Sequence, residues 1–418
     1  MNKLSFKPHK LNKESFNFLR FIGPGLLVAV GFIDPGNWAT NIAAGSQFGF
    51  QLLWIVTLST IILILLQHNA AHLGIVSGYC IAEAASKYVH PWFSKAVLWS
   101  AIFASMSATL AEILGGAIGL QILFHLPIPL GSFLLTITVI MIIFLNGYRK
   151  IEKLIIGFIV LIGLSFVFEL MLVQVPWLQV FYRSFAPSLP RQSLIIALSV
   201  LGAVVMPHNL FLHSEIIQSK QLHLQGEEVI EKELTYEFTS TLFSMGIGWV
   251  INATIIVLAA VTFFSNGMVV TELGQATELL KPLLGNMASL VFGFGLLLAG
   301  FSSSITAGMG GGTIYAGLYC EPYDVKDWHT RIGVLIPLVG SLLIIFFISN
   351  PFQALIVSQM LLSVQLPWTI FLQISLTSSK KIMGKYVNSK WDKILLWSTG
   401  ILITGLNLYL LYSWIFKK

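Results

Sequence analysis

Long apolar runs, separated by short polar segments, fill most of the chain. Stretches such as FLLTITVIMIIFL (133–145) and KILLWSTGILITGLNLYLLYSWIF (393–416) approach or exceed the roughly 20 apolar residues that cross a bilayer. The hydropathy pattern predicts eleven spans, at about 21–46, 51–75, 93–124, 127–146, 153–175, 192–218, 237–264, 286–319, 331–349, 352–376 and 392–415. The sequence therefore predicts an all-α polytopic membrane protein.

The composition supports this class. Of 418 residues, 56% are hydrophobic and 10% are charged, whereas soluble domains carry about 25% charged residues. The basic segment 1–20 is followed by no cleavage site, so we expect a retained cytoplasmic tail before a single transmembrane domain at 21–418. The two cysteines form no C-x-x-C motif, which argues against a disulfide framework or a thiolate metal cluster.

The distribution of Lys and Arg predicts the orientation in the membrane. With the N-terminus inside, 19 of the 24 basic residues are cytoplasmic and five are external: Arg183, Arg191, Lys281, Lys417 and Lys418. The positive-inside rule then places the N-terminus in the cytoplasm and the C-terminus outside. The basic residues lie in short loops, so membrane orientation explains the net charge of +6 better than nucleic-acid binding. The polar segment 219–237 is predicted to be an amphipathic surface helix.

Two spans are interrupted by a polar cluster around a proline. The first span contains Asp34-Pro35-Gly36-Asn37, and the sixth contains Met206-Pro207-His208-Asn209. Proline-broken helices in corresponding halves are typical of inverted-repeat transporters with a site at the bilayer midplane. The offset of five spans predicts one repeat at about 21–175, a second at about 192–376 and an extra helix at about 392–415.

The residues at these breaks indicate cation binding. A proline kink needs no acid, and Asp34 at midspan costs on the order of 3 kcal/mol on insertion scales. Candidate ligands are the Asp34 carboxylate, the Asn37 amide oxygen, a backbone carbonyl before the second break and the Met206 thioether. A soft sulfur beside hard oxygens favours transition metals over Mg²⁺ and Ca²⁺. A simple kink and a packing methionine are the structural alternatives.

Several motifs resemble one family. DPGN (34–37), within GPGLLVAVGFIDPGN (23–37), and GAVVMPHNLFLHS (202–214) are similar to motifs of the Nramp family of divalent metal transporters, as are LGIVSG (73–78) and SQMLLSVQLPW (358–368). The resemblance runs from residue 21 to about residue 377. It implies a leucine-transporter-type fold, with two inverted five-helix repeats plus an eleventh helix, and proton-coupled uptake of Mn²⁺ or Fe²⁺ by alternating access.

The resemblance also implies roles for particular residues. The metal ligands would be Asp34, Asn37, the Ala203 carbonyl and Met206, joined in some conformations by the Gly31 carbonyl and Gln359. The proton pathway would include His208, His213 and Glu112, although both histidines could instead be hydrogen-bonded core residues.

Some features depart from the family pattern or leave alternatives open. Thr109 stands where many relatives have an acid, so proton coupling could be weak. The alternatives are a magnesium-type or weakly coupled relative, a sodium-coupled amino-acid symporter of the same fold, and a membrane metal sensor that does not transport. We expect no enzyme activity, because H-E-x-x-H and nucleophile-elbow motifs are missing from the sequence.

Three further expectations follow from the sequence. No cofactor is expected beyond the transported ion, and no nucleic acid or obligatory protein partner is expected. The glycine run at 309–313 predicts close helix packing or a hinge, and His68 and His72 are interpreted as interface histidines.

Overall fold

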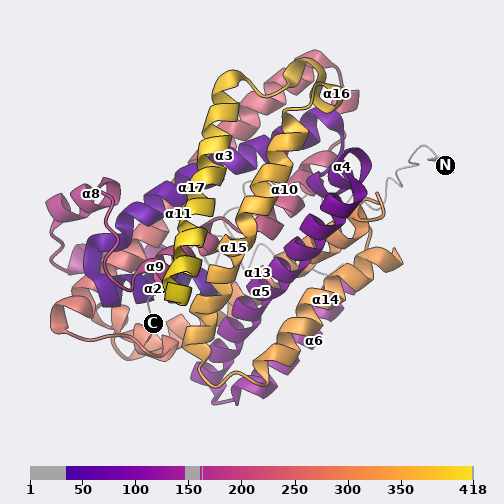
Figure 1. Ribbon diagram of the computed structural model, residues 1–418. Coiled ribbons are helices and arrows are strands. Elements are labelled where there is room, and N and C mark those ends of the chain that lie inside the picture. Colours follow the sequence, from indigo (N-terminus) through magenta and orange to yellow (C-terminus); the bar gives the residue numbers. More distant parts are fainter. Residues whose placement is uncertain (1–33, 146–160, 162, 417–418) are drawn as a thin grey trace.

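The computed structural model describes residues 34–145, 161 and 163–416 (Figure 1). Within those ranges the regular structure is entirely helical. The first half contains α2 (Pro35–Phe48), the 3₁₀ turn η3 (Gly49–Leu52), α3 (Leu53–Ser77), α4 (Ile81–Tyr88), α5 (Pro91–Phe124) and α6 (Ile128–Phe144). A shorter apolar helix, Gly163–Leu172, follows.

The second half begins after α8 (Trp177–Phe185) with a helix that is divided in two, α9 (Leu194–Val204) and α10 (Pro207–Ser219). It continues with α11 (Glu227–Thr262), α13 (Ala288–Gly317), α14 (Trp328–Ile345) and α15 (Pro351–Thr377), and ends with α17 (Lys390–Phe416). Short helical turns lie in the connections: η4 (Leu222–Leu224), η5 (Phe264–Asn266), η6 (Leu273–Leu279), α12 (Lys281–Leu284), η7 (Gly285–Met287), α16 (Lys380–Met383) and η8 (Gly384–Tyr386).

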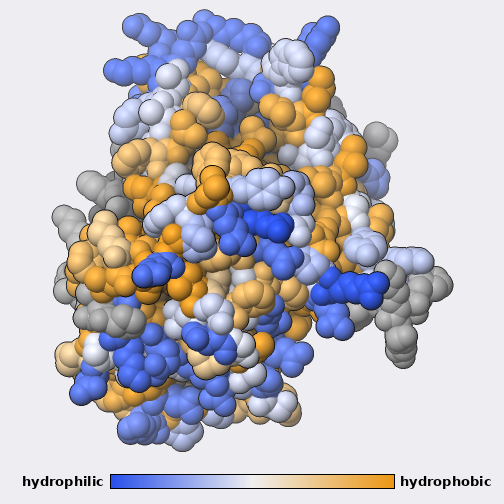
Figure 2. All heavy atoms as spheres, turned by 90° about the vertical axis from the view of Figure 1, so that its left-hand side faces the viewer, coloured by the Kyte–Doolittle hydropathy of each residue, from blue (hydrophilic) through white to orange (hydrophobic). Residues whose placement is uncertain are grey.

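Helices occupy the described parts of all eleven spans expected from hydropathy, whereas residues 21–33 of the first span and residues 153–160 and 162 of the fifth lie outside the described residues. Eight helical stretches in the described part of the chain are long and apolar enough to cross a membrane. One of them, Pro35–Ser77, comprises both α2 and α3, and another, Leu194–Leu224, comprises α9 and α10. The shorter helices Ile128–Phe144 and Gly163–Leu172 fall in the remaining two expected spans. Figure 2 shows hydrophobic atoms over much of one face, with hydrophilic atoms at its two ends and also in patches between them.

The prediction of a surface helix at 219–237 is wrong. Only a short 3₁₀ turn, Leu222–Leu224, precedes Gly226, and α11 then runs without interruption from Glu227 to Thr262. No proline lies within this range, so nothing ends the helix where the charged residues give way to apolar ones. Residues 227–237 are therefore the first three turns of a membrane helix.

Small residues let the central helices pack closely. A Cβ added to Gly300 of α13 would lie 2.5 Å from the Glu112 carbonyl oxygen and 2.6 Å from the Gly116 nitrogen, both on α5. In the glycine run, a Cβ on Gly311 would lie 2.6 Å from the Gly333 carbonyl oxygen of α14. This confirms the close-packing expectation for 309–313. Such contacts bring backbones together in a membrane, where no hydrophobic effect drives helices to associate.

Candidate metal centre

The first helix break places a carboxylate at the start of α2. Asp34 is the N-cap residue in extended conformation, and Pro35 occupies the first helical position, where its missing N–H costs no hydrogen bond. The Asp34 Oδ1 accepts a hydrogen bond from the Asn37 backbone N–H at 2.9 Å, and Oδ2 accepts one from the Asn37 side-chain amide. Both side chains are fully buried. The sequence D-P-G-N thus builds its own cap around an acid inside the membrane domain.

The second break contributes a backbone oxygen to the same place. Helix α9 ends at Val204, and α10 starts at Pro207 with Met206 as its N-cap. The Ala203 carbonyl oxygen accepts a hydrogen bond from Asn37 Nδ2 at 3.0 Å. The Asn37 amide therefore bridges the Asp34 carboxylate and the Ala203 carbonyl. Two segments 166 residues apart in sequence meet at their breaks.

Helix α15 supplies the third side of the centre. A Cβ added to Gly36 would lie 2.6 Å from Gln359 Cδ and 3.0 Å from Asp34 Oδ1, so the Gln359 amide rests directly on Gly36. Gln359 is fully buried, and neither its Oε1 nor its Nε2 has a hydrogen-bond partner among the described residues. An amide with this much unused bonding capacity is costly to bury. It is available to a ligand at the junction.

Met206 reaches towards α5 and α15. Its side chain is 2% exposed and packs in a small apolar cluster with Ala104, Ala108 and Leu362. Its sulfur accepts a hydrogen bond from Asn209 Nδ2 at 3.3 Å. The thioether thus packs against apolar side chains and also acts as a hydrogen-bond acceptor.

The three residues expected on the proton pathway lie in different surroundings. Glu112 of α5 is 1% exposed and within electrostatic range of the Asp34 carboxylate, and its Oε2 has no hydrogen-bond partner in the described structure. The His208 ring is fully buried beside Gly310, and neither ring nitrogen is hydrogen-bonded to a described residue. This contradicts the alternative that His208 is a hydrogen-bonded core histidine. His213 is paired: its Nε2 lies 3.4 Å from Glu237 Oε1.

Glu237, which no motif in the sequence indicates, contacts both His213 and His68. This acid is 4% exposed, and its Oε2 lies 2.7 Å from His68 Nδ1 while Thr241 donates a hydrogen bond to its Oε1 at 2.6 Å. His68 and His72 stack with ring centroids 6.2 Å apart. A row of titratable side chains thus leads from His213 to His68, which is partly exposed. The only sequence signals were the i, i+4 spacings of the His68–His72 and Glu237–Thr241 pairs.

Two expected positions contribute less. Thr109 donates its hydroxyl hydrogen to the Ser105 carbonyl at 2.8 Å, one turn earlier in α5. The Thr109 hydroxyl is therefore hydrogen-bonded within its own helix, three residues before Glu112. Gly31 lies outside the described residues.

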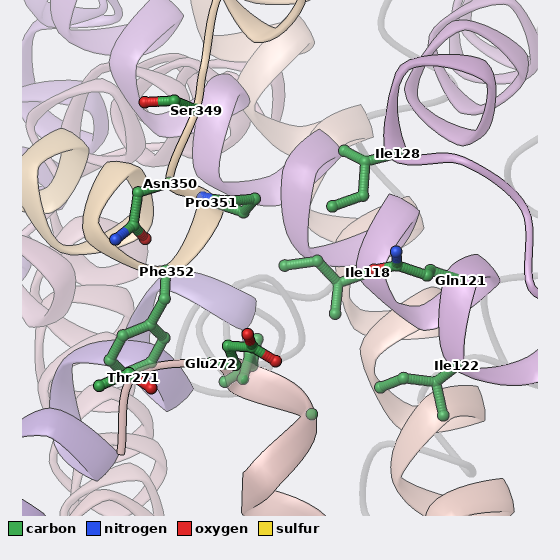
Figure 3. Close-up of a pocket in the computed structure, with 12 residues that line it drawn as sticks. Ile118, Gln121, Ile122, Ile128, Thr271, Glu272, Ser349, Asn350, Pro351 and Phe352 are labelled. Carbon is green, nitrogen blue, oxygen red and sulfur yellow. The ribbon is translucent and has the colours of Figure 1, made fainter. Parts of the chain in front are cut away.

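A cavity of about 520 Å³ lies between the end of α5 and the start of α15. Ile118 lies six residues beyond Glu112 on α5, and Asn350 lies nine residues before Gln359. Figure 3 shows the Glu272 side chain beside Ile118, Pro351 and Phe352 in this cavity. The cavity thus sits at one end of the two helices that flank the metal centre.

Comparisons with known proteins agree with this geometry. The family model described as natural resistance-associated macrophage protein-like (Nramp) matches residues 25–413. The divalent metal cation transporter MntH of Caldanaerobacter subterraneus subsp. tengcongensis is 37% identical over 413 residues, covering 96% of this chain and 95% of that protein. The MntH protein of Listeria innocua serovar 6a is 38% identical over 404 residues, covering 94% and 89% respectively.

Solved structures show the same architecture. The manganese transporter of Eremococcus coleocola, crystallised with an aromatic bis-isothiourea compound, has a TM-score of 0.76 at 29% identity and covers 99% of this chain and 90% of that chain. MhsT in complex with L-phenylalanine has a TM-score of 0.62 at 14% identity, covering 93% of this chain and 98% of that chain, so it is similar in fold alone.

The fold therefore defines a multi-pass membrane protein of the leucine-transporter type, with two inverted five-helix repeats and an eleventh helix. Its relatives are ion transporters, a non-enzymatic class, in agreement with the expectation from the motifs. The chain belongs to the Nramp family.

Proposed function

We propose that this protein is a secondary active transporter that imports divalent transition-metal ions into the cytoplasm, with Mn²⁺ as the main substrate and Fe²⁺ as a second. The observation that carries the proposal is the junction of the two helix breaks, where Asn37 bridges the Asp34 carboxylate and the Ala203 carbonyl. The names of the MntH relatives and of the E. coleocola manganese transporter support the same cargo.

In the proposed binding step, a cation replaces the Asn37 NH₂ group as the partner of two oxygens. In the structure the Asn37 NH₂ group donates to two oxygens that a dication would also attract. Rotation of that amide would turn its oxygen towards the ion and complete a shell with Asp34 and Ala203. Gln359 would add an amide oxygen, and Met206 a soft ligand that favours transition metals over Ca²⁺ and Mg²⁺. The Gly31 carbonyl would join in other conformations. The ion is cargo, and no resident cofactor is required.

Proton symport is the proposed driving force. Glu112 is buried within electrostatic range of Asp34, and His208 has ring nitrogens without a described partner next to Gly310. His213 continues through Glu237 to His68. Thr109 has no titratable group, whereas many relatives have an acid at that position. In this chain, proton transfer would therefore depend on Glu112, the histidines and Glu237. In alternating access, the metal centre would open first to the outside, through the cavity that Glu272 lines, and then to the cytoplasm. We also propose a cytoplasmic N-terminus and an external C-terminus.

The direct test is uptake of radioactive Mn²⁺ into liposomes that hold the purified protein, with and without an inward proton gradient. Uptake that the gradient accelerates supports the full proposal. Uptake that ignores the gradient removes only the coupling. The lack of uptake under both conditions, with Mn²⁺ binding retained, would favour the metal-sensor alternative, and binding of amino acids instead of Mn²⁺ would favour the symporter alternative.

A further inference from the structure

A thiol and two carboxyl groups lie together where α4 meets α10. Cys80 immediately precedes α4, Glu83 lies in its first turn, and Glu215 lies near the end of α10. One ligand atom from each residue lies within 4.8 Å of the others, and all three residues are buried. Glu215 follows Met206 by nine residues, about 13 Å along the helix axis. The cluster is therefore separate from the helix breaks.

A fourth buried side chain points into this cluster. Gln218 lies three residues after Glu215 on α10 and is 4% exposed. Its Nε2 donates a hydrogen bond to Glu83 Oε2 at 2.5 Å, while its Oε1 has no hydrogen-bond partner among the described residues. A buried acceptor left without a partner is destabilising. Gln218 thus contacts the cluster through Glu83, and its amide oxygen has no described partner.

The residue at position 80 is an unusual choice for a helix cap. The Cys80 sulfur accepts a hydrogen bond from the Glu83 N–H at 3.5 Å, and Glu83 completes a capping box by accepting from the Cys80 N–H at 3.3 Å. Ser, Thr, Asn and Asp are preferred there, so capping alone does not account for a thiol. Burial, together with the carboxyls of Glu215 and Glu83, raises the pKa of the Cys80 thiol. A bound dication would reverse this preference and stabilise the thiolate.

We propose that Cys80, Glu83, Glu215 and Gln218 form a second site for a divalent transition metal, with Zn²⁺ preferred. One sulfur and three oxygens suit a four-coordinate Zn²⁺ ion, and such a set binds Zn²⁺ more tightly than Mn²⁺. The Tyr323 N–H donates to Glu215 Oε1 at 3.0 Å and fixes that carboxylate from the segment after α13. The metal would fasten α4 to the end of α10, the helix whose start carries Met206, and so regulate transport from a distance.

Cobalt spectroscopy on the purified full-length protein tests this site. Co²⁺ bound to a thiolate gives a near-ultraviolet charge-transfer band, which the thioether and oxygen ligands of the helix-break centre do not give. Cys80→Ser removes the thiolate but retains a preferred N-cap residue. Cys320→Ser is the matched control, because Cys320 is half-buried and outside the ligand group. Asp34→Ala removes the helix-break centre.

The expected pattern is specific to each variant. Wild type and Cys320→Ser should bind two Co²⁺ per chain and show the band, and Zn²⁺ should abolish it. Asp34→Ala should bind one Co²⁺ with the band intact, and Cys80→Ser should bind one without it. Gln218→Leu, which removes the amide and offers no ligand atom, should weaken the band-forming site at least about tenfold.

The opposite results overturn the proposal. A wild-type protein without the band, or a band that survives in Cys80→Ser and is lost in Cys320→Ser, rules out the second site. An unchanged affinity in Gln218→Leu rules out the four-ligand set. Failure of the proposed transport centre is separately visible, because Asp34→Ala would then bind as many Co²⁺ ions as wild type.

Discussion

Asp34 has two separable roles, helix cap and proposed metal ligand, and two substitutions distinguish them. Asp34→Ala removes both the carboxylate charge and the side-chain acceptor for the Asn37 N–H. Asp34→Asn removes the charge and the acceptor for the Asn37 side-chain amide but keeps an oxygen for the Asn37 N–H, because Asn is as good an N-cap residue as Asp. We expect both variants to lose Mn²⁺ transport, and we expect Asp34→Ala to lose more stability than Asp34→Asn in the absence of metal, because only Asp34→Ala loses the capping hydrogen bond.

The magnitudes follow from the burial of the site. Loss of an N-cap costs about 1 kcal/mol, so metal-free Asp34→Ala should unfold more easily than wild type by roughly that amount. Removing one partner of a fully buried charge pair costs about 3–5 kcal/mol, which corresponds to a Kd for Mn²⁺ weakened by about 10²–10³·⁵. Mn²⁺ at 100 times the wild-type Kd should stabilise wild type by ~2.7 kcal/mol and either variant by less than about 0.5 kcal/mol.

The assay is thermal unfolding of the three proteins in detergent, with and without Mn²⁺, beside uptake into liposomes. Retention of Mn²⁺ stabilisation by Asp34→Asn would refute the role of the carboxylate charge in binding. Equal metal-free stability of Asp34→Ala and wild type would show that the capping hydrogen bond contributes nothing measurable.

Three further predictions test other parts of the centre. Met206→Ala should reduce the preference for Mn²⁺ over Ca²⁺ by about tenfold, ~1.4 kcal/mol of differential binding, and unchanged selectivity in competition titrations would exclude the thioether as a ligand. Gly36→Ala should weaken Mn²⁺ binding, because its Cβ displaces the glutamine amide of α15, whereas Gly246→Ala in α11, with open space around the added Cβ, should bind normally. Glu237→Gln should reduce the free energy of unfolding by about 1–3 kcal/mol, because buried His213 loses its carboxylate partner. The melting temperature should fall accordingly. An unchanged melting temperature in Glu237→Gln would contradict the pairing.

The sequence by itself determined the membrane class, the positions of the spans and the two breaks. A bilayer core offers no water to backbone groups, so apolar length and proline interruptions have direct structural consequences. The starts of α2 at Pro35 and of α10 at Pro207 are local effects of this kind. Motif resemblance added the family and the candidate ligands.

Only the tertiary structure decided which of these side chains meet. Gln359 is hundreds of residues from Gly36, and no local pattern states that its amide rests on that glycine. The pairing of His213 with Glu237 depends on where α11 begins, and its start was misjudged because charged residues can occupy the first turns of a membrane helix. Contacts between distant segments arise from helix packing, which depends on the shapes of whole surfaces and not on any short stretch of sequence.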